Sequence, residues 1–388
     1  MFPTISSFLE YFFGIKSTLP IPTFGFFVAL AFVLSYLTFL SEFKRKEREG
    51  IIKPIEKLVV EGKRASISDY LEFGLLGFLI GFKIIGAFLN MSLFSQAPLK
   101  FILSLNGSWP AGFLVSILFL YLIYWQKKQD KLDSPQFKKV LLHPYQLMPK
   151  LIIWAAIWGF LGAKVFNLLE NLPKYQAYGL TDFLKYSGLT FLGGLTFGAL
   201  SYLYIGYKNG MKLIDLADIG SPGMLVAYGV GRIGCQLSGD GDWGVVNNLP
   251  KPFSWLPDWM WSFKFPHNVL NEGIYINGCS GNYCSQLPHG VFPTSFYESV
   301  IILSCFLLLW LFRRKIKLPG LVFCFYLLIM GLERFFMEKI KLNFKYDMLG
   351  LRWSEAQIVS VMFILLAIVI GARIFYNRHI RIRKQSTQ

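Results

Sequence analysis

Long apolar segments recur along the whole chain, and they constrain its fold more than any other feature. A helix needs about 20 mainly apolar residues to cross the roughly 30 Å hydrocarbon core of a membrane. Nine segments meet this requirement, near residues 20–41, 72–92, 109–125, 150–170, 189–207, 213–237, 292–312, 319–337 and 354–377. With 54% hydrophobic and 16% charged residues, the chain is too apolar for a set of soluble domains. We therefore predict an all-α polytopic membrane protein with about nine transmembrane helices.

The positions of the basic residues predict its orientation. If the N-terminus lies outside, the inside segments hold 25 of the 39 Lys and Arg residues and the outside segments hold 10. Because basic residues concentrate in cytoplasmic loops, we expect an external N-terminus and a cytoplasmic C-terminus. The same asymmetry accounts for the net charge of +16 without a nucleic-acid partner. We expect no cleavable signal peptide, because the first 19 residues lack a basic start.

A duplication organises the first half of the chain. GFLIGFKIIGAFLN (77–90) is similar to GFLGAKVFNLLEN (159–171), and the two copies run in the same direction. Gly77-x-x-x-Gly81 in the first copy and Gly194-x-x-x-Gly198 in the span after the second copy predict closely packed helix pairs. We therefore divide the chain into a first span with its cytoplasmic loop (1–71), an extra duplicated helical pair (72–149), core spans four to six (150–237), an extracytoplasmic loop (238–291), and core spans seven to nine with a basic tail (292–388).

The long loop 238–291 is rich in Trp, Pro, Asn and Gly. Tryptophans prefer the headgroup level of a membrane, so we expect a partly ordered cap on the outer surface, with short strands as one option. Cys279 and Cys284 lie in this loop, where an oxidising compartment favours a disulfide. A zinc site with His267 and His289 is the weaker alternative, and we predict no metal.

The stretch GVGRIGCQLSGDGDWG (229–244) contains the pattern G-x-G-x-x-G of dinucleotide-binding turns. That pattern requires a strand before it and a helix after it. Here an apolar helical segment precedes it and a glycine-aspartate turn follows, so we reject a nucleotide site. The ionisable residues, and Arg232 above all, need another explanation.

Ionisable residues within predicted spans are candidates for function because they are costly in a membrane. Arg232 closes the sixth predicted span, and Asp240 and Asp242 follow it. Arg334 and Glu338 close the eighth span on one helical face. Tyr297 and Glu298 fall in the first turns of the seventh span, after Pro293, a residue favoured at helix starts. All these residues converge on the outer edge of the membrane.

Two interpretations of this convergence stay open. Two guanidinium groups at headgroup depth suit an anionic lipid phosphate, which arginine binds bidentately while staying charged. Alternatively, Arg232 and Arg334 form ion pairs with Glu298 and Glu338 that merely hold three helices together.

The same residues resemble the prolipoprotein diacylglyceryl transferase family of bacterial cytoplasmic membranes. GRIGCQLSGDGDWG supplies Arg232, Gly234, Gly239, Asp240 and Gly244 of the family's arginine-glycine signature. FPTSFYE (292–298) is similar to its His-Pro-x-x-x-Tyr-Glu block, and RFFMEKIK (334–341) to its Arg-x-x-x-Glu-x-x-Arg block. Lys164 lies where an arginine is common, and Gln357 with Ser360 resembles the last span. The resemblance covers about 20–41 and 150–375.

This resemblance implies a thioether-forming transferase without a metal or other cofactor. Its substrates would be phosphatidylglycerol and the lipobox cysteine in the signal peptide of a prolipoprotein, with membrane lipids around it. Catalytic roles would fall to Arg232, Arg334, Asp240 and Glu338. Substrate binding would involve Arg232 again and the further residues Lys164, Gly234, Gly239, Gly244, Tyr297, Glu298 and Gln357.

Several departures from the family pattern leave the proton acceptor open. Leu192 stands where the family has a histidine that would act as a base, and Cys235, Phe24 and Phe292 replace an asparagine, a tyrosine and a second histidine. A base would then be Asp240, Glu338, Glu298 or His289. These losses keep two alternatives: a non-catalytic relative that binds lipid or lipoprotein, and a lipid transporter or flippase, which the repeat and the embedded Lys83 and Lys164 suggest.

Overall fold

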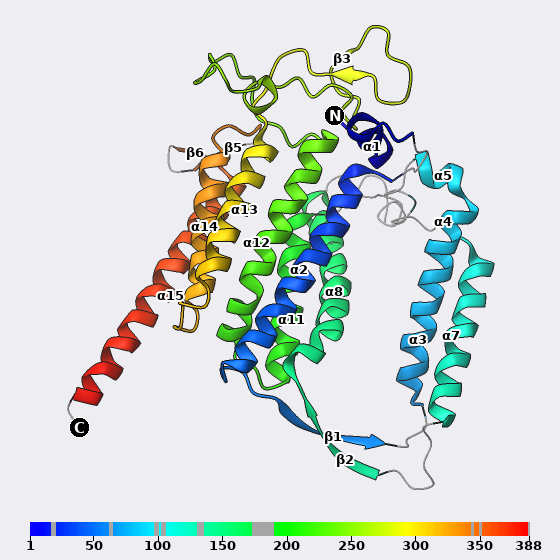
Figure 1. Ribbon diagram of the computed structural model, residues 1–388, viewed down its shortest axis with the longest axis vertical. Coiled ribbons are helices and arrows are strands. Elements are labelled where there is room, and N and C mark those ends of the chain that lie inside the picture. Colours follow the sequence, from blue (N-terminus) through cyan, green and yellow to red (C-terminus); the bar gives the residue numbers. More distant parts are fainter. Residues whose placement is uncertain are drawn as a thin grey trace. The chain divides into compact units, whose positions relative to one another are not determined.

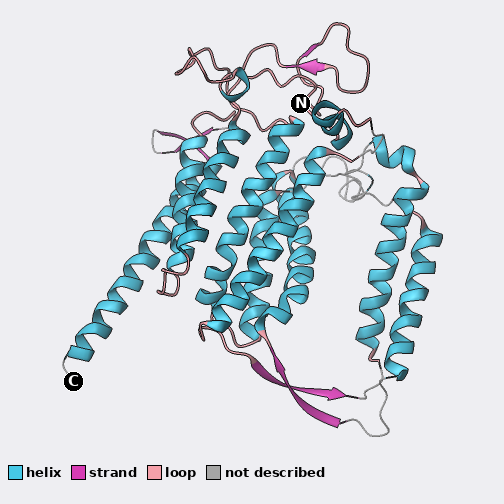
Figure 2. Ribbon diagram, viewed as in Figure 1, coloured by secondary structure: helices cyan, strands magenta, loops and turns pink. Residues whose placement is uncertain are grey.

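Helices make up most of the chain, as the apolar segments predict (Figure 1; Figure 2). The structure is a computed structural model, and it describes residues 1–16, 21–61, 65–96, 101, 106–129, 136–172, 190–342, 345–348 and 351–386. The chain divides into two compact units. The first comprises Met1–Ile51 with Met211–Gln388, and the second comprises Ile52–Gly210.

Seven helical segments within the described residues are long and apolar enough to cross a membrane, so the chain is a polytopic membrane protein. They are Thr23–Arg48, Asp69–Leu89, Trp109–Gln129, Pro144–Glu170, Leu213–Ser238, Thr294–Phe312 and Glu355–Ile380. Two further helices coincide with the remaining predicted segments: α11 (Phe191–Lys208) has 18 residues and α14 (Leu321–Met337) has 17. The predicted total of nine spans therefore stays a prediction.

The first unit is built around α12 (Leu213–Ser238), which packs against α2 (Thr23–Arg48), α13 (Thr294–Phe312) and α14. α15 (Glu355–Ser386) packs against α14. In the most apolar stretch of α12, 67% of the residues are buried, compared with 28% or less in the other six candidate spans. The central position of α12 explains how it can carry buried polar residues.

α12 continues without a break through Ser221-Pro222-Gly223, although proline and glycine are unfavourable in a helix interior. Ser221 donates its hydroxyl to the carbonyl of Ala217 at 2.7 Å. The carbonyl of Gly223 accepts from the Ser35 hydroxyl of α2 at 3.0 Å. A side chain at position 223 would overlap the ring of Phe39, so this glycine allows α2 and α12 to approach closely.

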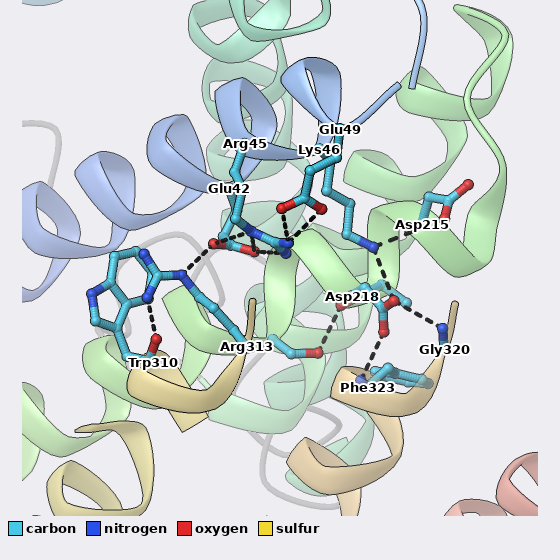
Figure 3. Close-up of polar contacts among 12 residues, drawn as sticks. Glu42, Arg45, Lys46, Glu49, Asp215, Asp218, Trp310, Arg313, Gly320 and Phe323 are labelled. Atoms are coloured by element: carbon cyan, nitrogen blue, oxygen red, sulfur yellow. Dashed lines mark hydrogen bonds and ion pairs between the residues drawn. The ribbon is translucent and has the colours of Figure 1, made fainter. Parts of the chain in front are cut away.

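One end of α12 is fixed by buried charges (Figure 3). Asp218, which is 1% exposed, accepts hydrogen bonds from the backbone N–H groups of Gly320 (2.8 Å) and Phe323 (2.9 Å) and from the Lys46 ammonium (3.0 Å). Gly320 is the N-cap residue of α14 and has a left-handed φ of 90°. A carboxylate of α12 therefore caps α14, which satisfies two N–H groups that a helix start leaves unpaired.

Glu42 of α2 completes this end of the unit. Its carboxylate is fully buried and contacts the guanidinium groups of Arg45 at 2.6 Å and Arg313, directly after α13, at 2.8 Å (Figure 3). Because a buried charge requires a partner, these contacts hold the ends of α2, α12, α13 and α14 in register.

The loop after α12 folds over its own hydrophobic cluster. Trp243, Phe265, Leu287 and Val291 are buried together, and Met1 packs against them. The short helix η3 (Asp258–Met260) and the strands β3 (Ile274–Tyr275) and β4 (Ser285–Gln286) lie in this loop. Cys279 and Cys284 form a disulfide, as one of the two alternatives predicted. Helix α1 (Ile5–Phe13) precedes α2 at the start of the unit.

The second unit contains two helix pairs. Its elements are β1 (Ile55–Glu61), α3 (Ile67–Leu79), the π-helix η1 (Ile80–Ile85), α4 (Gly86–Leu89), α5 (Met91–Gln96), α7 (Trp109–Gln129), β2 (Gln136–Leu142), η2 (Pro144–Leu147), α8 (Met148–Glu170) and α11. α3 packs against α7, and α8 packs against α11. Close packing at the glycines is confirmed: a Cβ on Gly77 would lie 2.9 Å from the Val115 carbonyl, and one on Gly198 would lie 3.3 Å from the Ala155 carbonyl.

The all-α prediction holds for the fold class, and the described residues add three short two-stranded antiparallel sheets. In the first, β1 pairs with β2 from Ile55↔Leu142 to Glu61↔Gln136. In the third, β5 (Lys345–Met348) pairs with β6 (Leu351–Ser354). Only the strands of the long loop were anticipated. β1 and β2 lie outside the predicted spans, and their pairing partners are distant in sequence.

Candidate functional site

The glycine-rich stretch turns the chain back at the end of α12. Gly239 ends the helix with a left-handed φ of 66°, and Gly241 follows with a φ of 96°. Glycine adopts such angles without a Cβ penalty. At Gly244, a Cβ would lie 2.5 Å from the Ile340 carbonyl and 2.9 Å from the Phe292 side chain. The chain can therefore pass between the start of α13 and the end of α14 only as glycine.

Backbone hydrogen bonds fix this passage. The N–H of Gly244 donates to the carbonyl of Phe292 at 2.9 Å, and the N–H of Val245 donates to the carbonyl of Ile340 at 2.8 Å. The carbonyl of Asp242 accepts hydroxyl hydrogen bonds from Thr294 (2.7 Å) and Ser295 (2.8 Å) of the first turn of α13. Asp242 is thereby held beside α13.

Glu298 is the centre of a cluster of ion pairs at this end of the unit. Its carboxylate is fully buried and contacts three cations: Arg232 Nε of α12 at 2.9 Å, Arg334 Nη1 of α14 at 3.3 Å and Lys341 Nζ at 2.8 Å. The predicted convergence of Arg232, Glu298 and Arg334 is confirmed. Three helices thus bring their charges to one point.

Two further carboxylates complete what we call the Glu298 cluster. Asp242 contacts both Arg232 and Lys341, the latter at 2.6 Å. Glu338 lies 3.7 Å from Arg334, which confirms that these residues share one helical face. The cluster comprises Arg232, Asp242, Glu298, Arg334, Glu338 and Lys341.

The charges within the cluster are balanced, but the two arginines remain accessible. Arg232 and Arg334 have side chains that are 18% and 28% exposed, whereas those of Glu298 and Glu338 are fully buried. The ring of Tyr228 also lies 4.8 Å from the Arg232 guanidinium. The ion pairs expected if these residues only hold the helices together are therefore present. Each arginine still offers N–H groups to an anion that approaches from its exposed side.

Lys341 is a member of the cluster that the sequence did not single out as a site residue. Burial lowers the pKa of Lys341 to about 8, although the neighbouring Glu298 favours its charged form. Its backbone forms a β-bridge with Gly244, which explains its position. The signal available was the matched RFFMEKIK block, in which a lysine stands where the family has an arginine.

Comparisons with known proteins identify the family of the chain. The family model described as prolipoprotein diacylglyceryl transferase matches residues 109–373. Phosphatidylglycerol–prolipoprotein diacylglyceryl transferases of Staphylococcus aureus strains JH9 and Newman are each 28% identical to the chain over 231 residues, which is 58% of this chain and 74% of theirs. The chain belongs to the prolipoprotein diacylglyceryl transferase family.

Family membership gives the geometry of the Glu298 cluster its context. Arg232, Glu298, Arg334 and Glu338 come from the three blocks on which the resemblance was based, and all lie within the matched range. Asp240, the acid that follows the end of α12, does not contact the cations of the cluster. Asp240 forms no ion pair with a described residue; its carboxylate accepts a 3.4 Å hydrogen bond from the Asp242 N–H and interacts with the Cys235 thiol. The aspartate that contacts the cations is Asp242.

Other predicted site residues lie outside the cluster. The Tyr297 hydroxyl donates to the Met260 carbonyl at 2.7 Å and so anchors the long loop. Gln357 accepts from the Ser354 N–H at 3.0 Å at the start of α15. Gly234 packs against Phe27 of α2. Lys164 belongs to α8 in the second unit.

The remaining candidates are also placed. His289 is exposed in the long loop, and Leu192 belongs to α11. Among the described residues, no three His, Cys, Asp or Glu side chains gather as a metal site. Glu333 of α14, which the sequence analysis does not single out, is also buried, with 6% of its surface exposed. Ionisable residues at the centre of a membrane helix cost about 2.5–3.5 kcal/mol, so Glu333 requires an explanation.

Proposed function

We propose that this chain transfers the diacylglyceryl group of phosphatidylglycerol to the lipobox cysteine of prolipoproteins, which forms a thioether and releases a glycerol phosphate. The observation that carries the proposal is the convergence of Arg232 and Arg334, from two helices, on one buried carboxylate with their outer faces accessible. Family membership supplies the reaction class, and the cluster supplies cations for the lipid phosphate.

The cluster fits the electrostatic demand of such a reaction. Negative charge builds up on the phosphate oxygen as the bond to the glyceryl carbon breaks, and preorganised cations stabilise that charge. Glu298 holds Arg232, Arg334 and Lys341 close together before any lipid arrives. Because the cations need not reorganise, their attraction for the leaving phosphate acts at once.

The proposed topology places this chemistry at the outer leaflet of the bacterial cytoplasmic membrane. With nine spans and an external N-terminus, the end of α12 that carries Arg232 faces outward, and the loop 238–291 forms the cap. Prolipoprotein signal peptides would reach the same side during export. The extra pair, residues 72–149, forms an addition to the core spans.

The test is transfer of labelled diacylglyceryl from phosphatidylglycerol vesicles to a lipobox peptide by the purified protein. We expect thioether product from the wild type and at least a tenfold loss for Arg232→Ala and Arg334→Ala, which corresponds to about 1.4 kcal/mol of barrier. Arg373→Ala, which removes an exposed arginine of α15, is the matched control and should keep full activity. Retained activity in either cluster variant would contradict the phosphate assignment.

The ion pairing of both arginines favours one second candidate, a relative that binds lipid or lipoprotein without turnover. Arg232 and Arg334 each already have a carboxylate partner, as residues with a purely structural role would. Binding of phosphatidylglycerol by folded wild-type protein without thioether formation would support this candidate over the transferase.

A further inference from the structure

Glu333 is a buried glutamate outside the Glu298 cluster, and its surroundings differ from those of Glu298 and Glu338. Both carboxylate oxygens of Glu333 are buried, and neither has a hydrogen-bond partner among the described residues. The hydroxyl of Tyr228 in α12 is buried without a hydrogen-bond partner among the same residues. Buried polar groups are nearly always paired, so two unpaired ones in one region call for a ligand or a reaction that uses them.

Glu333 lies beside the proposed phosphate site. It directly precedes Arg334 in α14, and its charge interacts with those of Glu298, Arg334, Arg232 and Lys341. On α12 and α13 it also interacts with Tyr228 and Cys305. These are the titratable and charged groups around it on the helices that pack against α14.

The carboxylates of the cluster are already paired with cations. Glu298 contacts three cations, and Asp242 contacts two. Glu338 has Arg334 within 3.7 Å. Glu333 differs from these three acids, because no ion pair holds its buried carboxylate among the described residues.

We propose that Glu333 accepts the proton of the lipobox thiol in the transfer reaction, an inference that rests on the proposed function. A cysteine thiol has a pKa of about 8.5, so most of it is protonated at neutral pH and must lose its proton to react. Glu333 is none of the four candidates that the sequence suggested as a base.

The step balances as follows in atoms and electrons. The S–H bond breaks and its proton moves to a Glu333 oxygen. The sulfur electron pair forms an S–C bond with the glyceryl carbon that carries the phosphate, while the C–O bond breaks and its electron pair leaves with the glycerol phosphate. The proton then passes from Glu333 to the released phosphate or to water, which restores the carboxylate. No oxidant or further co-reactant is needed.

The experiment compares two lipobox peptides that differ only in the nucleophile, one with cysteine and one with selenocysteine. A selenol is already ionised at neutral pH and needs no base. The purified wild type, Glu333→Gln and Glu333→Asp proteins are each assayed with both peptides in phosphatidylglycerol vesicles. Glu355→Gln removes an exposed acid at the start of α15 and is the matched control.

General base catalysis typically contributes 10²–10⁴-fold, so Glu333→Gln should lose about that factor with the cysteine peptide and less than about tenfold with selenocysteine. Glu333→Asp should recover part of the loss. The ratio of the two rates does not depend on how much of a variant is folded. Equal losses with both peptides, or no loss with either, would overturn the role of Glu333.

The wild type separates this inference from the proposed function. If it forms thioether with both peptides but Glu333→Gln keeps an unchanged rate ratio, only the role of Glu333 falls. If the folded wild type forms no product with either peptide, the transferase proposal falls and takes this inference with it.

Discussion

Replacing Glu298 with glutamine tests whether the Glu298 cluster is held together as the structure indicates. Glutamine keeps the shape of the side chain but removes the charge that faces Arg232, Arg334 and Lys341 at 2.8–3.3 Å. Removal of one partner of a buried ion pair costs about 3–5 kcal/mol. Because the two arginines are partly exposed, we expect the lower end, about 3 kcal/mol, which is roughly a 100-fold change in the unfolding equilibrium.

The free energy of unfolding can be measured by titration of the protein with dodecyl sulfate in mixed micelles, followed by the fluorescence of its 10 tryptophans. Glu333→Gln is the matched control, since it changes an equally buried glutamate that has no ion pair among the described residues. It should change the free energy by less than about 1 kcal/mol.

A second substitution sharpens this prediction. In Glu298→Gln, Lys341 faces the arginines with only Asp242 as its partner. Adding Lys341→Met removes one of the two cations that then share Asp242, so the double variant should be more stable than Glu298→Gln alone. Two results would contradict this coupling. The free energy of unfolding of Glu298→Gln could lie within about 1 kcal/mol of the wild-type value, or the effects of Glu298→Gln and Lys341→Met could simply add in the double variant.

Three further predictions concern single positions. The pKa of Lys341 is lowered to about 8, so its positive charge is present below pH 8 and is lost as the pH rises. The transfer rate should therefore decline above pH 8. Lys341→Arg stays charged and should remove this decline in a pH–rate profile. Asp218→Ala removes the cap of α14 and the partner of Lys46, and should lower the free energy of unfolding by about 2 kcal/mol or more while folded protein still binds phosphatidylglycerol normally. Asp242→Asn should reduce the transfer rate more than tenfold and Asp240→Asn less than about threefold, because only Asp242 contacts the cations; the reverse order would return Asp240 to the site.

Hydrophobic segments predicted the helices well because a helix in a membrane satisfies its own backbone and needs only local sequence. The predicted segment 213–237, for example, corresponds to α12 at Leu213–Ser238 despite Pro222. The pairing of β1 with β2 could not be read in this way. Ile55 pairs with Leu142 across the whole α3–α7 segment, and no local pattern specifies such a distant partner.

The part of the candidate site that could be predicted is the part for which the depth of a residue in the membrane was enough to place it. Arg232, Glu298 and Arg334 each lie at the outer end of a predicted span, so the sequence predicted that they share one depth, and the structure shows that they are in contact. The choice between Asp240 and Asp242 depended on the left-handed turn at Gly239 and Gly241, whose direction sequence does not specify. Glu333 was overlooked although the rule that selected Arg334, an ionisable residue within a span, applied to it equally.

α14 connects the two charged ends of the first unit and explains why the site can be rigid. Asp218 fixes its first N–H groups, and Glu298 holds Arg334 near its last turn. Fourteen residues separate Gly320 from Arg334, which is about 21 Å of helix at 1.5 Å per residue. A helix anchored at both ends cannot rotate or slide without breaking a buried ion pair or its cap. The position of Glu333 is therefore set by protein contacts at both ends of α14.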